Sequence, residues 1–316
     1  MRDKILLLLK KNCFVSGEKL AKNLGISRTA IWKHIQILKN LGYDIKSVKN
    51  KGYQLISSPD IPISEEITKG LNTKIIGRNF FYYKSLDSTN TLAKQKIKKC
   101  HAPEGTIIVA NVQTSGKGRK NRTWYSPEGG LWFSVILYPD IPPQQGMLIT
   151  MISSISIAQA IKEITSLKPL IKWPNDILIN GKKVCGILTE LDAEMDRINY
   201  SVVGIGLNVN NTLDDVLKKK ATSLSKETKT KVSRVKLMRC IIKYLDKNYG
   251  KFVSGDYLHI KDLWFLYSDI IGREILVRDE NIITKGLVSD VDKDGCLILK
   301  TNTGIKRIIS GDIEYT

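Results

Sequence analysis

The sequence is poor in the features that mark disulfide-rich, zinc-binding and membrane-spanning proteins. Its five cysteines, among 316 residues, are scattered, and no two of them form a Cys-x-x-Cys pair. An odd, unclustered set argues against a disulfide framework or a zinc site and fits a reducing cytoplasm. The apolar run at residues 5–9 is too short for a signal peptide. No run reads as long and apolar enough to cross a membrane, so we expect a cytoplasmic protein with no membrane partner.

Acidic residues are also scarce. The chain has 31 of them against 50 basic residues, a net charge of +19, and this balance favours polyanionic partners such as nucleic acids or nucleotides. The excess is uneven, because residues 1–58 hold 12 basic and 3 acidic residues, a net of +9. We therefore expect an N-terminal nucleic-acid module. The length suggests two or three domains, and a hydrophobic content of 42% suffices for globular cores.

The N-terminal module has the spacing of a helix-turn-helix. After a first helix at residues 2–11, Ser16 can cap a second helix, Gly25 ends it, and Ser27 caps the third. The apolar residues of the third helix recur at i, i+4 and i+7 and predict one buried face, made by Ile31, Ile35 and Leu38. Polar and basic residues early in this helix stand where base edges would be met.

Two short strands then flank the basic turn at residues 49–52, like the wing of a winged helix. A basic wing tip suits phosphate contacts. A helical protein-interaction module is the alternative, but helix, turn, capped recognition helix and basic wing occur together and favour DNA binding. The predicted DNA-contacting residues are Ser27, Arg28, Thr29, Trp32, Lys33, Lys49 and Lys51. Residues 57–62 have the composition of a linker.

Residues 113–127 are the most informative segment of the chain. They place four cations and two glycines between two apolar runs. Glycine lets a backbone approach a ligand, and adjacent N–H groups with Lys and Arg suit a polyanion. The segment is not a Walker A loop, because no Gly-Lys-Ser/Thr closes it. Taken alone, the segment fits two interpretations about equally well: a loop that binds a polyanionic ligand, and a solvated basic hairpin or nonspecific nucleic-acid patch.

Three other segments add polar groups at the ends of expected strands and helices. Residues 87–90 (Asp-Ser-Thr-Asn) follow an aromatic strand, and there a helix cap competes with contact to a polar ligand head. Residues 172–176 (Lys-Trp-Pro-Asn-Asp) end a strand at a proline and place an amide and a carboxylate on a turn. The Asn-Gly hairpin at 180–181 leads into a strand that carries Lys183. Residues 147–164 are predicted to form a buried helix.

The C-terminal part reads as a small β domain. Short apolar strands are expected at residues 271–277, 284–289, 296–299 and 305–309, with turn residues between them. A five-stranded barrel fits this pattern. It would be either a passive cap or a part of the site.

In order, and over nearly the whole chain, these motifs resemble the family of bifunctional biotin–protein ligases and biotin-operon repressors (the BirA family). The matching segments are 16–55, 87–90, 116–119 with 124–127, 172–176 and 183–187. The resemblance implies an α+β protein: an N-terminal winged helix-turn-helix, a central class II aminoacyl-tRNA-synthetase-like mixed sheet with helices, and a C-terminal SH3-like β-barrel. We place these domains at residues 1–58, 63–270 and 271–316.

The resemblance also implies roles for residues. Those expected to contact biotin are Ser88, Thr89, Asn90, Gln113, Lys117, Gly118, Arg119 and Lys183. Those expected at the nucleotide are Arg119, Trp124, Asn175, Asp176 and Asn208. The catalytic set is Lys183, Arg119 and Asp176, and no metal-ligating residue is predicted.

The loop departs from the family pattern at two positions. Lys117 replaces an arginine and loses its planar, bidentate fork. Asn121 replaces the last glycine, and because Asn tolerates the left-handed backbone better than most residues, the loop shape can survive. Residues 210–220, where the family folds a loop over adenine, contain no Trp, so those contacts do not transfer.

The implied activity is ATP-dependent ligation of biotin, through biotinyl-5'-AMP and with Mg²⁺, to the biotin carboxyl-carrier domain of acetyl-CoA carboxylase. The implied second activity is biotin-dependent repression of biotin biosynthesis by a homodimer on operator DNA. One alternative is a lipoate or octanoate ligase on the same fold, which typically lacks the winged helix. The other is a biotin-sensing repressor without ligase activity, against which the retained Arg119 and Lys183 argue.

Overall fold

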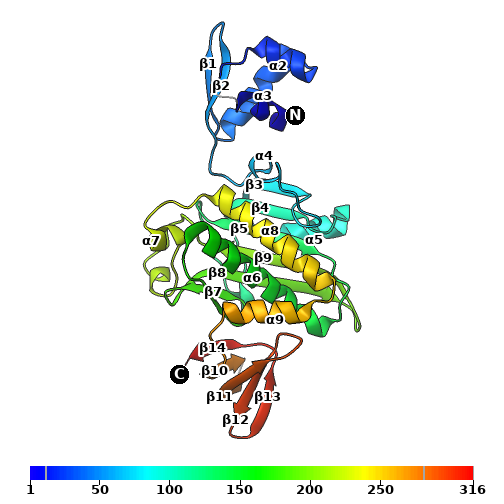
Figure 1. Ribbon diagram of the computed structural model, residues 1–316, viewed down its shortest axis with the longest axis vertical. Coiled ribbons are helices and arrows are strands. Elements are labelled where there is room, and N and C mark those ends of the chain that lie inside the picture. The colour runs from blue at the N-terminus through cyan, green and yellow to red at the C-terminus, as the bar shows by residue number, and fades with distance from the viewer. Residues whose placement is uncertain (11–12, 280–281, 316) are drawn as a thin grey trace. The chain divides into compact units, whose positions relative to one another are not determined.

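A computed structural model describes residues 1–10, 13–279 and 282–315. The chain divides into two compact units, residues 1–69 and 70–316. Together they give the predicted mixed α+β class, with a helix-turn-helix part, a central mixed sheet covered by helices, and a small antiparallel sheet at the C-terminal end (Figure 1). The domain boundaries at 58, 63, 270 and 271 stay a prediction.

The first unit is a winged helix. Its elements are α1 (Arg2–Leu9), α2 (Gly17–Leu24), α3 (Arg28–Asn40), β1 (Asp44–Val48), β2 (Gly52–Ser57) and α4 (Ser64–Ile67). Both predicted caps are confirmed, because the Ser16 and Ser27 hydroxyls each accept a backbone N–H at 3.1 Å. Gly25 ends α2 in the left-handed region at φ 67°. The predicted buried face of α3 is fully buried. The first helix ends at Leu9, and the predicted end at Lys11 lies outside the described residues.

A short segment after the wing is tied to the same unit. The carboxylate of Glu66, on α4, accepts a hydrogen bond from the Tyr43 hydroxyl at 2.7 Å and pairs with Lys10 at 3.3 Å. Glu65 pairs with Arg2 at 2.7 Å. These contacts explain why the segment around α4 groups with the winged helix.

The second unit is built on a seven-stranded mixed sheet. Its strands are β3 (Phe80–Leu86), β4 (Ile107–Gln113), β5 (Leu131–Leu137), β6 (Leu170–Lys172), β7 (Asp176–Ile179), β8 (Lys182–Ala193) and β9 (Ile198–Leu207). They run in the order β3-β4-β5-β9-β8-β7-β6, with β3–β4 parallel and the other pairs antiparallel. The expected Asn180-Gly181 hairpin joins β7 to β8, with φ of 50° and 75°.

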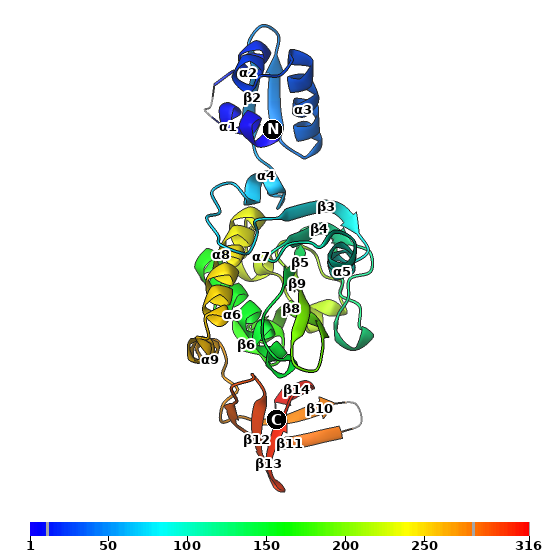
Figure 2. The same cartoon turned by 90° about the vertical axis from the view of Figure 1, so that its right-hand side faces the viewer.

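Helices cover both faces of this sheet (Figure 2). They are α5 (Thr89–Cys100), α6 (Gly146–Thr165), α7 (Leu224–Thr228), α8 (Arg234–Val253) and α9 (Tyr257–Leu266), with short 3-10 turns at Arg119–Asn121, Pro143–Gln145 and Leu217–Lys219. Figure 2 shows α5 on one face and α6 with α8 on the other. Ala93 of α5 packs on the sheet in a buried cluster that includes Ile108, Ile136 and Val202.

The predicted long buried helix is confirmed as α6, but one expectation about it was wrong. Among the described residues, the helical stretch Pro143–Thr165 is long and apolar enough to cross a membrane. It is 72% buried inside the unit, where it packs on the sheet and on α8. The same apolar composition serves a core helix, because α6 is covered on nearly every side.

The C-terminal sheet has five antiparallel strands. They are β10 (Glu274–Asp279), β11 (Ile282–Val291), β12 (Leu297–Thr301), β13 (Gly304–Ile308) and β14 (Asp312–Tyr315), in the order β13-β12-β11-β10-β14. Four strands match predicted segments. Sequence patterning gave no separate signal for β14, which adds to the edge of β10.

The carboxylate of Asp246, on α8, orders the chain ahead of β3. It accepts backbone N–H bonds from Lys74, Ile75 and Ile76 at 2.9, 2.7 and 2.9 Å. We expect Asp246→Ala to lower the free energy of unfolding by about 2–3 kcal/mol, because several donors lose their acceptor at once. Calorimetry checks this. Asp262→Ala, at an exposed position of α9, is the matched control, and an equal loss in both variants would contradict the role of Asp246.

Candidate functional site

Glycines on one face of two central strands leave room for a cavity. Side chains alternate between the faces of a strand, so Gly204 and Gly206 of β9 share a face. Gly186 of β8 pairs directly with Gly206. A Cβ atom at 204 would stand 2.2 Å from Asn90 Oδ1, and one at 206 would stand 2.2 Å from Trp124 Nε1. Only glycine lets these side chains lie against the sheet.

The cavity has a volume of about 380 Å³ and collects the predicted site residues from separate segments. All twelve residues predicted for biotin, nucleotide or catalysis line it: Ser88, Thr89, Asn90, Gln113, Lys117, Gly118, Arg119, Trp124, Asn175, Asp176, Lys183 and Asn208. Their individual roles stay predictions. A neighbouring cavity of about 530 Å³ shares five lining residues with the first: Arg122, Asn175, Asp176, Lys220 and Asp312.

A chain of hydrogen bonds fixes the polar end of the cavity. Gln113 Oε1 accepts from the backbone N–H and the hydroxyl of Thr89 at 2.8 and 3.0 Å. Gln113 Nε2 donates to Ser126 Oγ at 2.9 Å. The fully buried Ser134 hydroxyl lies 2.7 Å from Thr89 Oγ1 and 2.6 Å from Asn90 Oδ1. Ser88 both caps α5 and lines the cavity, so the two interpretations of this residue are compatible.

Asn90 is held from behind by charged residues. Its Nδ2 donates to Glu190 at 2.8 Å, and Glu190 pairs with Lys94 at 2.7 Å. Burial opposes the charge of Glu190, but hydrogen bonds from Lys94 and Asn90 and the charges of Lys94 and Lys117 outweigh it and lower the pKa of this carboxyl. With both ends of its amide engaged by protein groups, Asn90 is placed to orient the pocket wall rather than to reach far into the cavity.

A lysine, a carboxylate and an indole meet on another part of the cavity wall. Lys183 Nζ lies 2.7 Å from Asp176 Oδ1 and 5.0 Å from the centroid of the Trp124 ring. The backbone of Lys183 is fixed by a bond to Lys220 O at 3.0 Å and one from Thr222 N at 2.9 Å. Burial raises the pKa of the adjacent Cys185 thiol, so this cysteine is a neutral core residue. Of the two lysines of β8, Lys183 lines the cavity and Lys182 does not.

The glycine-rich loop closes as a small hairpin. Gly118 N donates to Arg122 O at 2.7 Å, and Trp124 N donates to Gly116 O at 2.8 Å. Asn121 has a φ of 57°, which confirms that asparagine takes the left-handed backbone where the family has glycine. Lys120 has a φ of 52°, which the sequence did not indicate.

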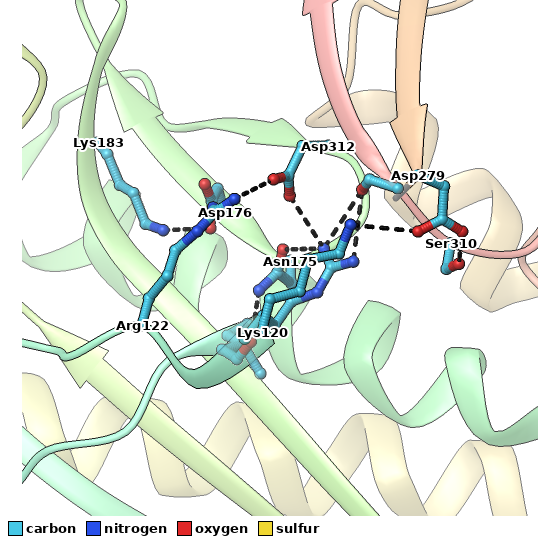
Figure 3. A network of polar contacts seen from close by, with 11 residues as sticks. Lys120, Arg122, Asn175, Asp176, Lys183, Asp279, Ser310 and Asp312 are labelled. Carbon is cyan, nitrogen blue, oxygen red and sulfur yellow. Dashed lines mark hydrogen bonds and ion pairs between the residues drawn. The ribbon is translucent and has the colours of Figure 1, made fainter. Parts of the chain in front are cut away.

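The loop cations reach acceptors from two distant segments (Figure 3). Arg119 Nη1 donates to Asn175 Oδ1 at 3.1 Å, and both terminal nitrogens lie 3.4 Å from Gly311 O. Asn175 Nδ2 donates to Ile187 O at 2.7 Å, which leaves its oxygen facing Arg119. Arg122 pairs with Asp312 at 2.5 Å.

Several lining residues were missed by sequence reasoning. They are Arg122, Thr123, Tyr125, Ile187, Leu188, Gly204, Ile205, Gly206, Leu213, Leu217, Lys220, Ala221 and Asp312. The alternating small residues of β8 and β9 were a usable signal for the glycines. Leu213 and Leu217, in the segment where no Trp was found, form an apolar wall instead. Nothing local marked Asp312.

On the winged helix, a groove separates α3 from the wing. Four of the predicted DNA-contacting residues line it: Arg28, Thr29, Trp32 and Lys49. Trp32 is 52% exposed although it is large and apolar, as expected of a contact residue. The Ser27 hydroxyl caps α3 by accepting a hydrogen bond from Ala30 N. The contacts themselves stay predictions.

Comparison with known proteins agrees with this arrangement. The model of the biotin/lipoate A/B protein ligase family matches residues 82–208, a helix-turn-helix model matches residues 2–54, and the biotin protein ligase C-terminal domain matches residues 270–315. A winged helix joined to a ligase-type sheet and a small C-terminal sheet defines a class of DNA-binding ligases.

Relatives of that class resemble the chain over nearly its whole length. It is 43% identical to the bifunctional ligase/repressor BirA of Bacillus subtilis, over 96% of this chain and 94% of that protein. It is 28% identical to BirA of Escherichia coli, over 98% and 96%. The Aquifex aeolicus biotin protein ligase, solved with biotin and ATP, covers 76% of this chain and 99% of its own at 30% identity and a TM-score of 0.65. The chain therefore belongs to the BirA family of bifunctional ligase/repressors.

The lowered pKa of Glu190 predicts how stability changes with pH. Because the folded-state pKa lies below the ordinary carboxyl value, the ionised group stabilises the fold above that value, and this contribution disappears as pH falls through the folded-state pKa. At pH 7 we expect Glu190→Gln to cost about 1 kcal/mol. Denaturant unfolding between pH 7 and 3 should show the variant approaching the parent. Glu194→Gln, in an exposed pair with Arg197, should show no such trend.

Proposed function

We propose that the chain is an ATP-dependent biotin–protein ligase that acts through biotinyl-5'-AMP and doubles as a biotin-dependent repressor. One observation carries the ligase half: a single cavity gathers every residue predicted to handle biotin, nucleotide and chemistry, from segments that span residues 88 to 208. The glycine face and apolar walls suit a flat, mostly apolar ligand with a polar head, and the cations at the other end suit phosphate. The similar Aquifex enzyme was solved with both biotin and ATP, which supports a site for these two ligands.

In the first step, the biotin carboxylate attacks the α-phosphate of ATP and pyrophosphate leaves. Negative charge builds on the phosphate oxygens in the transition state, so fixed cations stabilise it most. Lys183 and Arg119 are held for this by Asp176 and by Asn175 with Gly311. Because these positions are set by folding, little reorganisation is needed when charge develops.

ATP would bring Mg²⁺ with it. Within residues 1–10, 13–279 and 282–315, no three His, Cys, Asp or Glu side chains gather as a metal cage, and Mg²⁺ on a nucleotide typically needs one or two carboxylates plus phosphate oxygens. Asp176 lines the cavity, and with one carboxylate oxygen paired to Lys183 its other oxygen would hold the ion. When bound, the ion neutralises phosphate charge.

In the second step, a lysine of a carrier protein attacks the biotinyl-adenylate. This intermediate is a mixed anhydride that water would hydrolyse, so the site must exclude water until the acceptor arrives. The loop at residues 116–122 lies along the cavity wall and is the segment suited to cover it. We take the acceptor to be the biotin carboxyl-carrier domain of acetyl-CoA carboxylase.

The repressor half follows from the winged helix. The BirA relatives are named ligase/repressors, and the chain carries Arg28 and Lys49 beside an α3 groove. We propose a homodimer that reads a two-fold operator in the cytoplasm.

The test is a ligation assay with product mass as the readout. The protein is incubated with ATP, Mg²⁺, an apo carrier domain and either biotin or lipoate. We expect a mass gain of one biotinyl group on the carrier and none with lipoate. A lipoyl adduct would show the alternative ligase, and no adduct with either acid would show a repressor without ligase activity.

Lys183→Ala should slow adenylate formation by a factor equivalent to about 2–4 kcal/mol, the cost typical of removing one preorganised donor. Pyrophosphate release measures it. Lys182→Ala is the matched control, because the neighbouring Lys182 ammonium points to Lys218 O at 3.1 Å and lies outside the cavity lining. Near-normal pyrophosphate release by the Lys183 variant would remove this residue from the mechanism.

DNA binding should require biotin with ATP and weaken steeply with salt, with a log–log slope of about −0.9 for each phosphate neutralised. Footprinting on operator DNA at several salt concentrations checks both points. Arg28→Ala should weaken binding, whereas Lys22→Ala, at an exposed position of α2, should not. Equal occupancy with and without biotin and ATP would show constitutive binding and end the repressor proposal.

A further inference from the structure

The cations of the glycine-rich loop are held by the C-terminal sheet. Lys120 Nζ lies 3.1 Å from Asp279 Oδ1, at the end of β10. Arg122 pairs with Asp312 at 2.5 Å, at the start of β14, and Arg119 Nη1 lies 3.9 Å from the same carboxylate. Figure 3 shows Lys120 and Arg122 of the loop approaching Asp279 and Asp312 of the C-terminal sheet. Three cations in four residues thus meet two carboxylates more than 150 positions away in sequence.

The contacts form one connected group rather than isolated surface pairs. Arg119 is bonded to Asn175, in the turn between β6 and β7, and to the carbonyl of Gly311, in the turn between β13 and β14. The hydroxyl of Ser310 donates to the second oxygen of Asp279 at 2.5 Å and fixes that carboxylate. Isolated exposed ion pairs contribute little to stability, because each pair must order two long side chains. In a network, one ordered side chain makes several contacts, so less side-chain entropy is lost per contact.

Both carboxylates are charged at neutral pH. A hydrogen bond from Ser310, then one from Lys120, lowers the pKa of Asp279. For Asp312, partial burial opposes the charge, but the hydrogen bond from Arg122 and the charges of Arg122, Arg119 and Lys120 outweigh it and lower the pKa. Each carboxylate therefore faces the loop as an anion.

We propose that Asp312 and Asp279 are positioning residues that hold the loop at residues 116–122 closed along the cavity, so that the C-terminal sheet controls how long a ligand is retained. Asp312 lines the cavity together with Arg119 and Arg122. Holding both guanidinium groups by one carboxylate sets where their remaining N–H groups point. The retention role rests on the proposed ligase function, whereas the closure itself does not.

Hydrogen–deuterium exchange of the full chain without added ligand tests the closure. The amides of Gly118, Arg122 and Trp124 are bonded inside the loop hairpin, so their exchange reports its opening. We expect Asp312→Asn and Asp279→Asn each to speed exchange of this segment about fivefold, and the double variant more. Glu274→Gln is the matched control, since its partner Lys285 lies within the same C-terminal sheet. Unchanged exchange in the double variant would overturn the proposal.

Exchanging the charges of Lys120 and Asp279 distinguishes the effect of their direct pairing from the effect of removing one charge. Lys120 lies outside the cavity lining, so exchanging it with its partner leaves the lining residues in place. Lys120→Asp and Asp279→Lys should each open the loop, and the combined variant should restore most of the slow exchange. Additive opening in the combined variant would contradict direct pairing.

The second readout is the lifetime of the bound intermediate. With ATP and biotin but no carrier, Asp312→Asn should release biotinyl-adenylate about fivefold faster than the parent and Glu274→Gln. If loop exchange rises but release does not, the sheet positions the loop without governing retention, and that half of the proposal falls. If no adenylate forms in any protein, the proposed ligase function fails, while the exchange result still decides the closure.

Discussion

Three glycines on one face of β8 and β9 set the dimensions of the cavity and the positions of its walls. Gly186, Gly204 and Gly206 let Asn90 and Trp124 lie against the sheet, and a Cβ at any of the three would stand 2.8 Å or closer to one of these two side chains. Strands gain little from glycine, which packs nothing and loses more entropy on folding. The surrounding rows of buried aliphatic residues on β4, β5 and the opposite faces of β8 and β9 offset that weakness.

Two kinds of polar group surround this glycine face, and each is stabilised in a different way. At one end, uncharged hydroxyl and amide groups are buried, and each finds a partner in the chain that joins Gln113, Thr89, Ser134 and Asn90. At the other end, cations that would repel one another are spaced by carboxylates, with Asp176 beside Lys183 and Asp312 between two arginines. Hydroxyl and amide groups around Gln113 and Asn90, and cations around Lys183 and Arg119, make two chemically different parts of the cavity wall. Such a wall suits a ligand with an apolar body and an anionic tail.

The features that could be predicted from the sequence are those that depend on residues close together in the chain. Helix caps, hairpin turns and the buried face of α3 depend on neighbours within a few residues, so Ser16, Ser27 and the Asn180-Gly181 turn were predicted correctly. Asn121 was also foreseeable, because backbone preference belongs to the residue itself. Asp312 was not, since its role depends on tertiary contact with the loop, and a lone acid in a short β segment has no pattern. For α6 the error was of another kind: a core helix and a membrane helix share composition, and only burial separates them.

The position of Trp124 has an optical consequence. Of the five tryptophans, Trp132, Trp173 and Trp264 are fully buried in packed cores, and Trp32 belongs to the winged helix. Trp124 alone among them joins the glycine-rich loop to the cavity wall, with its ring 5.0 Å from the Lys183 ammonium. A nearby charge alters indole emission, so occupancy of the cationic end and displacement of the loop would both change the fluorescence of this residue. Fluorescence of Trp124, which lines the cavity beside Lys183, would therefore report on this site without an attached dye.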